Sequence, residues 1–107
     1  MRGDVKKYLD RFVAEFSALN IPCESHVLFG SQATGKATAR SDVDVAVVMS
    51  RELTARERGA LLNIGPCIDL GFDADLFFTN SEMLDNAGET LDTNYFIRKE
   101  GIRIWPV

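Results

Sequence analysis

Apolar and polar positions along this chain switch between two periods, one typical of helices and one typical of strands. Residues 4–20 carry apolar side chains at helical spacing. Residues 24–29 predict a strand, and the small polar residues 31–39 predict a short helix start followed by a loop. Residues 42–49 predict a second strand, whose nearly continuous valines favour a central position buried on both faces.

The second half of the chain continues this alternation. Thr54 is a suitable N-cap for a third helical segment, and residues 73–78 predict a third strand. Ser81 is a suitable cap for a short helical turn, residues 91–100 return to helical spacing, and residues 102–105 predict a brief extended tail. The order α-β-α-β-α-β-α predicts a single α/β domain over all 107 residues.

Composition narrows the class of protein. A chain of 107 residues is long enough for one modest core, and its net charge of −4 argues against general binding of nucleic acid. Neither Cys23 nor Cys67 lies in a CxxC pattern, so zinc is not expected. The first residues lack the apolar core of a signal peptide, and no apolar run approaches membrane length. We therefore expect a cytoplasmic protein with reduced thiols.

Candidate chemistry begins where the first predicted strand ends, at Gly30 and Ser31. A glycine lets the backbone approach a phosphate, and the helix start that follows offers amide donors together with the Ser31 hydroxyl. The alternative is an ordinary strand-to-helix turn with Ser31 as N-cap. The P-loop pattern is absent, because alanine follows Gly35-Lys36 where that pattern has serine or threonine.

A pair of carboxylates, Asp42 and Asp44, opens the second predicted strand. Side chains two apart on a strand point to the same face, where two negative charges repel unless a cation lies between them. Magnesium prefers such oxygen ligands and commonly binds one or two carboxylates together with substrate phosphates. Solvated carboxylates at a strand start are the alternative. With the glycine turn, the pair indicates a site for a nucleoside triphosphate and magnesium, and hence phosphoryl or nucleotidyl transfer.

A two-metal mechanism requires a third carboxylate. Asp73 and Asp75 are candidates, again two apart on one predicted strand face, and Asp69 is a weaker one. We favour Asp75, because the apolar residues 76–78 continue it as a core strand, and keep Asp73 as the alternative. A solvated edge strand would also explain this pair.

Other polar residues near the motif have less specific interpretations. Lys36 and Arg40 lie in the loop between its two halves, where they could neutralise triphosphate charge or simply be exposed. The single histidine, His26, is interpreted as a strand-face or surface residue rather than a catalytic one. Trp105 is predicted to pack on the first helix or to join a partner interface. The seven phenylalanines are predicted to be core residues: Phe12, Phe16, Phe29, Phe72, Phe77, Phe78 and Phe96.

Together these motifs resemble a known family. Gly30-Ser31, ten residues, Asp42-x-Asp44 and a later strand Asp75-Leu76-Phe77 resemble the nucleotidyltransferases of the DNA polymerase β superfamily. The small size resembles the minimal nucleotidyltransferase (MNT) group, and residues 97–102 are similar to the I-x-x-E-G-hydrophobic ending of those proteins. The resemblance covers nearly the whole chain.

The resemblance implies a small mixed β-sheet flanked by helices, and transfer of AMP from ATP to an acceptor hydroxyl. It implies that Asp42, Asp44 and Asp75 bind two magnesium ions, and that Gly30 and Ser31 hold the β and γ phosphates. Minimal members are often encoded beside a helical HEPN ribonuclease toxin, which the MNT antitoxin adenylylates and binds. One departure from larger relatives is the absence of a second domain for an acceptor, which then has to come from a partner surface or a second copy.

Three functions stay open on the sequence alone. The first is a magnesium-dependent adenylyltransferase that modifies a HEPN-type partner protein within a toxin–antitoxin pair. The second is a non-catalytic antitoxin that acts by occlusion, although such a binder has no need of mutually repelling carboxylates. The third is a nucleotidyltransferase acting on a small molecule, of the aminoglycoside type, with an accessory subunit.

Overall fold

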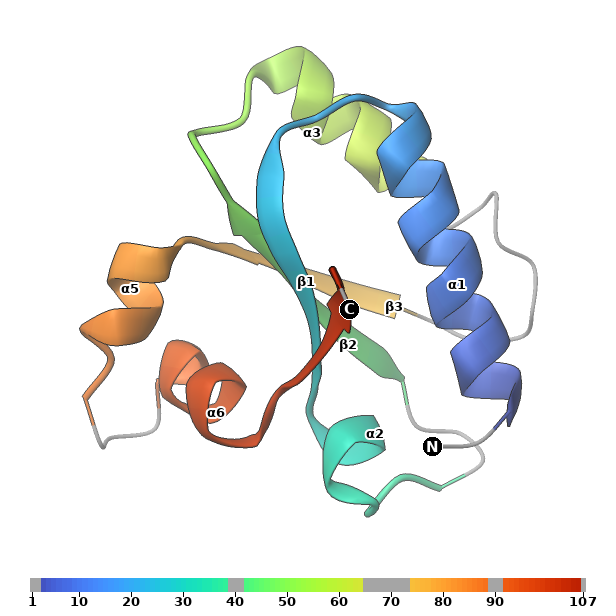
Figure 1. Cartoon of the computed structure of the whole chain (residues 1–107), viewed down its shortest axis with the longest axis vertical. Coiled ribbons are helices and arrows are strands. Elements are labelled where there is room, and N and C mark those ends of the chain that lie inside the picture. The colour runs from blue at the N-terminus through green and yellow to red at the C-terminus, as the bar shows by residue number, and fades with distance from the viewer. Residues whose placement is uncertain (1–2, 39–41, 65–73, 89–91, 107) are drawn as a thin grey trace.

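The computed structural model describes residues 3–38, 42–64, 74–88 and 92–106. Its elements follow in chain order, and Figure 1 shows their arrangement. They are α1 (Gly3–Ala18), β1 (Cys23–Phe29), α2 (Ser31–Thr34), β2 (Val43–Met49), α3 (Ala55–Leu62), β3 (Ala74–Thr79), α5 (Ser81–Asp85), α6 (Thr93–Glu100) and β4 (Ile102–Trp105). The order of helices and strands agrees with the prediction from apolar spacing, except at the C-terminal end.

The four strands form one mixed sheet in the order β3-β2-β1-β4. β1 pairs antiparallel with both β2 and β4, whereas β2 and β3 run parallel. The predicted central position of β2 is confirmed, because successive residues from Val45 to Met49 are all buried. The predicted extended tail is an edge strand, with Ile102 opposite Leu28. Its pairing partner lies more than seventy positions away in the sequence, so local spacing gave no sign of it.

Helices cover both faces of the sheet (Figure 1). On one face Val43, Val45 and Val47 belong to the main apolar cluster, which includes the buried stripe of α1 and Leu61 of α3. The opposite face of β2 carries the side chains of even-numbered residues, because successive residues point to opposite faces. The helices α5 and α6 lie on that side, where the Thr79 hydroxyl of β3 donates a 2.5 Å hydrogen bond to the Asn94 side chain of α6.

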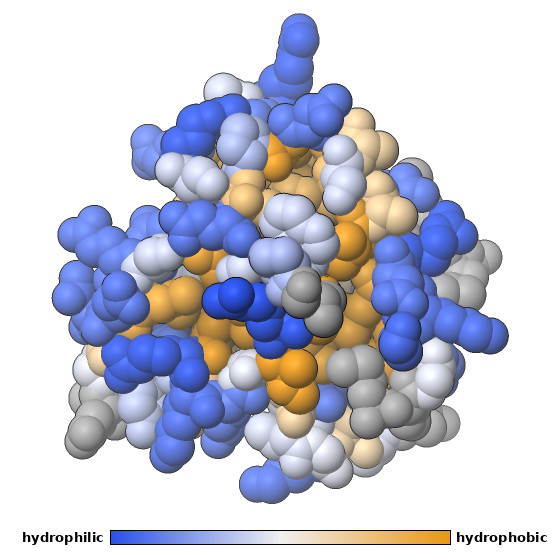
Figure 2. All heavy atoms as spheres, in the orientation of Figure 1, coloured by the Kyte–Doolittle hydropathy of each residue, from blue (hydrophilic) through white to orange (hydrophobic). Residues whose placement is uncertain are grey.

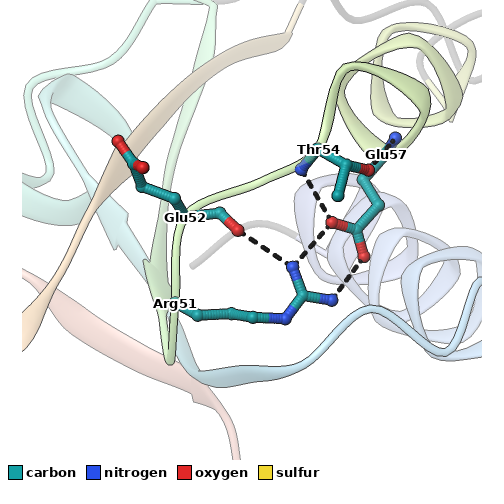
Figure 3. A network of polar contacts seen from close by, with 4 residues as sticks. All are labelled: Arg51, Glu52, Thr54 and Glu57. Carbon is teal, nitrogen blue, oxygen red and sulfur yellow. Dashed lines mark hydrogen bonds and ion pairs between the residues drawn. The ribbon is translucent and has the colours of Figure 1, made fainter.

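A network of charged groups fixes the start of α3 (Figure 3). Thr54 is the N-cap, as predicted, and it forms a capping box with Glu57. Arg51 donates two hydrogen bonds of 2.8 Å to the Glu57 carboxylate and one of 2.9 Å to the Glu52 carbonyl oxygen. The Arg51 hydrogen bonds, aided by the Thr54 amide, hold the pKa of Glu57 down at about 2. The side chain of Arg51 is therefore held at this turn by its hydrogen bonds.

Several local predictions were wrong. The N-cap of α2 is Gly30 rather than Ser31, which is the first helical residue. Asn80 rather than Ser81 caps α5, because its side-chain oxygen accepts a 2.8 Å hydrogen bond from the Met83 amide. Asp42 precedes the first residue of β2 instead of opening the strand.

The phenylalanine prediction holds for two of the six phenylalanines that the structure describes. Phe12 and Phe16 of α1 are buried, whereas the side chain of Phe78 is 37% exposed near the end of β3. The other described ones are half-buried: Phe29 ends β1, Phe77 lies on the edge strand β3, and Phe96 lies on α6. Phe72 lies outside the described residues.

The surface is mixed in character. Figure 2 shows polar side chains around most of the outline, with apolar side chains between them. Among the helices that the structure describes, none combines the length and apolarity that crossing a membrane requires.

His26 lies on the core-facing side of β1 and is 1% exposed, in agreement with the strand-face prediction. Its ring packs between Phe12 and Phe16 of α1 and Trp105 of β4. Trp105 therefore faces the first helix through this ring. Nδ1 of His26 is buried, with no hydrogen-bond partner among the described residues. This burial lowers the pKa of His26 from 6.5 to about 4.

The buried ring predicts acid sensitivity. Because its folded pKa is the lower one, the unfolded chain binds the His26 proton more readily, and stability is lost as the pH falls from 6.5 to about 4. The loss is about 3 kcal/mol in all, and above pH 6.5 it vanishes. Urea unfolding of the wild type and of His26→Phe across this range measures the difference. Parallel pH profiles for the two proteins would contradict the prediction.

Candidate functional site: an acidic sheet edge beside a glycine turn

The motif residues meet at one end of the two central strands. β1 ends at Phe29, directly opposite Asp44 near the start of the antiparallel β2. β3 starts at the same end, and its Asp75 pairs in register with Asp44. Gly30 follows β1, and Asp42 precedes β2. The topology therefore gathers residues that are up to 45 positions apart in the sequence.

Asp44 and Asp75 are neighbours on one face of the sheet, because residues in register on adjacent strands share a face. Asp44 is half-buried, whereas Asp42 and Asp75 are exposed. Burial raises the pKa of Asp44, and the negative charges of Asp75 and Asp42 raise it further. Asp44 is thus close enough to both other carboxylates to feel their negative charges.

The glycine turn packs directly against Asp44. Gly30 has φ 74° and ψ −156°, a conformation that side chains disfavour, and a Cβ there would collide with Oδ2 of Asp44. The carbonyl oxygen of Gly30 accepts hydrogen bonds from the Ala33 and Thr34 amides at 3.0 and 3.2 Å. These bonds close the first turn of α2, whose earliest amides have no acceptor within the helix. Backbone donors and a carboxylate therefore lie side by side.

The donor set suits a divalent cation that arrives with a nucleotide. Within the described residues, no three histidine, cysteine, aspartate or glutamate side chains are gathered closely enough to hold a metal alone. Magnesium, however, commonly binds one or two carboxylates and completes its shell with water and phosphate oxygens. A cation beside Asp44 would relieve the repulsion that raises its pKa. The residues present fit such an ion.

Of the other predicted site residues, the structure describes only Lys36. Lys36 is exposed after α2, where its amide donates to the Ser31 carbonyl oxygen at 3.1 Å. Arg40, Asp69 and Asp73 lie outside the described residues. Of the predicted third carboxylates, the structure describes Asp75 alone.

Two aromatic residues that the sequence assigned to the core lie on the aspartate side of the sheet. Phe29 is opposite Asp44, and Phe77 is two positions after Asp75, so both share its face. Their rings contact edge to face with centroids 6.3 Å apart, and both are half-buried. The two-residue spacing of Phe77 from Asp75 was a signal in the sequence, whereas the place of Phe29 depends on the register of β1 with β2. They supply an apolar floor next to the carboxylates.

A small mixed sheet with carboxylates at one edge and a glycine turn beside them is the arrangement expected of a nucleotidyltransferase. Residues 14–104 match the family described as "Polymerase beta, Nucleotidyltransferase", so the chain belongs to this family. A search of curated proteins gives no match.

Solved structures share the fold. A toxin–antitoxin crystallised with AMP-PNP is 24% identical, with a TM-score of 0.59, over 97% of this chain and 73% of that one. A mutant of the toxin–antitoxin MntA-HpeT, with two aspartates two positions apart changed to glutamate, is 23% identical. Its TM-score is 0.56, over 87% of this chain and 69% of that one. At such identities the likeness extends to the fold alone.

Proposed function

We propose that this nucleotidyltransferase moves AMP from ATP to a hydroxyl of a partner protein in a magnesium-dependent reaction, and acts as the antitoxin of a HEPN-type toxin. The observation that carries the proposal is the register of Asp44 with Asp75, with Gly30 packed against Asp44. This arrangement puts paired carboxylates next to backbone amides. A nucleoside triphosphate with its magnesium requires both.

Each site residue has a role in this proposal. Asp42, Asp44 and Asp75 bind two magnesium ions, while Gly30 and Ser31 hold the β and γ phosphates. The ions neutralise charge on the phosphates when bound. The acceptor oxygen attacks the α phosphorus, the bond from this phosphorus to the bridging oxygen breaks, and pyrophosphate leaves. Asp75 accepts the hydroxyl proton, since it is the exposed member of the registered pair.

The two basic side chains of the motif loop, Lys36 and Arg40, have weaker support. Lys36 is exposed on the loop after α2 and is proposed to contact the triphosphate. Arg40 is proposed for the same role from its place in the sequence. Asp73 stays the alternative to Asp75, on the basis of its spacing in the sequence.

The partner part of the proposal draws on the solved relatives. One was crystallised as a toxin–antitoxin with AMP-PNP, an ATP analogue, and the other is a toxin–antitoxin in which two aspartates were mutated. A paired toxin would provide the surface that carries the acceptor hydroxyl. Its identity as a HEPN protein follows from the family resemblance.

The test uses ATP labelled at either phosphate. The protein is incubated with magnesium and the product of the adjacent reading frame, once with α-labelled and once with γ-labelled ATP. Label should reach the partner from the α position only, and EDTA should prevent it. Asp75→Asn is expected to slow transfer by roughly a hundredfold or more, because it removes a charge that acts at the reacting centre. Transfer of the γ label would instead indicate a kinase.

A matched control variant and an assay in cells distinguish catalysis from occlusion. Asp10→Asn makes the same chemical change on α1, where the exposed Asp10 forms a surface ion pair with Lys6, and should leave transfer unchanged. If Asp75→Asn still neutralised the toxin fully in cells while losing transfer, occlusion would be the function. Transfer that persists at wild-type rate in Asp75→Asn would contradict the assigned role.

A further inference from the structure

A groove of about 760 Å³ lies at the end of β2 and β3 that is remote from the aspartates. Its walls come from the turn after β2, from α3 and from the start of α5. Asp44 and Ser50 are six residues apart on the extended β2, so the groove lies roughly 20 Å from the acidic edge. The proposed catalytic residues have no part in it.

The rim of this groove is apolar and exposed. Leu62 at the end of α3 is 76% exposed, Met83 in α5 is 47% exposed, and Phe78 in β3 is 37% exposed. These are three of the five large apolar side chains that are exposed in the described part of the chain. Leu53 and Met49 continue the apolar lining inward. Such a concentration is typical of an interaction surface.

The charged groups around the groove divide by side. Arg51 is already bound to Glu57 (Figure 3), and the Glu24 carboxylate accepts a hydrogen bond from the Ser81 hydroxyl. Arg58 on the α3 side and Glu82 on the α5 side both line the groove. Within the described residues neither forms an ion pair.

Arg58 and Leu62 are four residues apart on α3, so they lie on the same helix face. An apolar centre with a cation on one flank and an anion on the other is complementary to itself. A two-fold axis through the centre brings the α3 side of one copy to the α5 side of the other. The axis cannot bring Arg58 of one copy to Glu52 of the other, because both residues lie on the α3 side. It brings Arg58 to Glu82, which lies on the α5 side.

We propose that this groove is the interface of a symmetric dimer, in which a second copy of the chain buries Leu62, Phe78 and Met83. Arg58 of each copy then faces Glu82 of the other, twice per dimer. The two acidic edges stay open at the far ends, so dimerisation leaves both proposed catalytic sites accessible. This inference does not depend on the proposed function.

The first experiment measures mass. Sedimentation equilibrium of the full chain over a concentration series should give a species of twice the 11.9 kDa chain mass. Leu62→Asp should weaken the dimer by at least about tenfold, because a charge then occupies the apolar centre. Leu62 is exposed, so its replacement should leave the fold of the single chain intact, and circular dichroism checks this. A wild type that stays at the single-chain mass would overturn the proposal.

Charge exchange tests the pairing itself. Arg58→Glu and Glu82→Arg should each weaken the dimer, whereas the double variant should restore it, since the pair is re-formed with its signs reversed. Arg56→Glu makes the same change on the same helix outside the groove, and should have no effect. A dimer unaffected by all of these variants has its interface elsewhere, which overturns the proposal. A monomer whose variants lose binding to the partner protein overturns it too, in favour of that partner.

Discussion

Asp44→Asn is expected to lower nucleotidyl transfer by roughly a hundredfold or more, while making the fold more stable. Asp44 is the carboxylate on which both Asp75 and Asp42 act, and its amide replacement cannot supply the negative charge that a magnesium ion requires. The same charge is unfavourable in the folded chain, because burial and the charges of Asp75 and Asp42 raise the pKa of Asp44. Losing it removes that repulsion.

The size of the stability gain depends on pH. An acid whose folded pKa is raised binds its proton more readily in the folded chain, so stability falls as the pH rises through that pKa. Asp44→Asn should therefore raise the melting temperature by a few degrees at neutral pH, and the gain should shrink in acid. Melting curves at neutral and acidic pH, with the transfer assay alongside, measure both effects. A variant that loses activity and also melts earlier at neutral pH would show misfolding rather than chemistry.

The opposite directions of these two effects are typical of functional sites. Repelling carboxylates persist where a function requires them, at a cost to stability. Asp10→Asn again provides the control, because its exposed surface position predicts little change in either measurement.

Apolar spacing predicted the elements that have strong local signals. The valines of β2 indicated a central strand, and the helical stripe of α1 indicated its buried face. β4 was missed as a strand because four residues of mixed character acquire strand geometry only through pairing with β1. Short elements of this kind depend on tertiary contacts rather than on their own propensity.

The caps show the same limit. Thr54 was predicted because it precedes a clear helical pattern, whereas at α5 the competition between Asn80 and Ser81 was decided by backbone geometry. Both residue types are good N-caps, and only the position at which the chain turns selects one of them.

Alternation along a strand suggested part of the site, but the register between strands could not be predicted. The spacing of Asp42 and Asp44 suggested one shared face. The neighbour of Asp44 on the next strand depends on how β2 and β3 align. The sequence offered Asp73 and Asp75, and Asp75 was favoured because apolar residues follow it. The alignment puts Asp75 beside Asp44. The pairing of Phe29 with Phe77 follows from the same register, so it was beyond sequence reasoning for the same reason.

Gly30→Ala is expected to destabilise the fold by about 2–4 kcal/mol. It is also expected to reduce nucleotidyl transfer, because it displaces the Asp44 carboxylate. Two costs act together. The backbone of Gly30 has a positive φ of 74° with extended ψ, and the added methyl would meet Oδ2 of Asp44. The carboxylate then has to leave the position in which it faces the glycine turn, so the phosphate and metal parts of the site move apart.

Gly35 supplies the matched control for this substitution. It also has a positive φ, 77°, but a Cβ there has nothing within 4 Å. Gly35→Ala therefore measures backbone strain without a clash, at a cost of about 1 kcal/mol. The excess loss in Gly30→Ala measures the collision with Asp44 together with the added strain of an extended ψ at positive φ, which Gly35 does not have. Equal losses in the two variants would contradict the collision.

A double-mutant cycle locates that excess. Asp44→Gly removes the carboxylate, so Gly30→Ala should cost less in that background than in the wild type, by about 1 kcal/mol or more. Urea unfolding of the four proteins gives the coupling energy. Additive losses would mean that the turn and the carboxylate are independent. A clear coupling would mean that the glycine is required at this position by the aspartate beside it as well as by its own backbone.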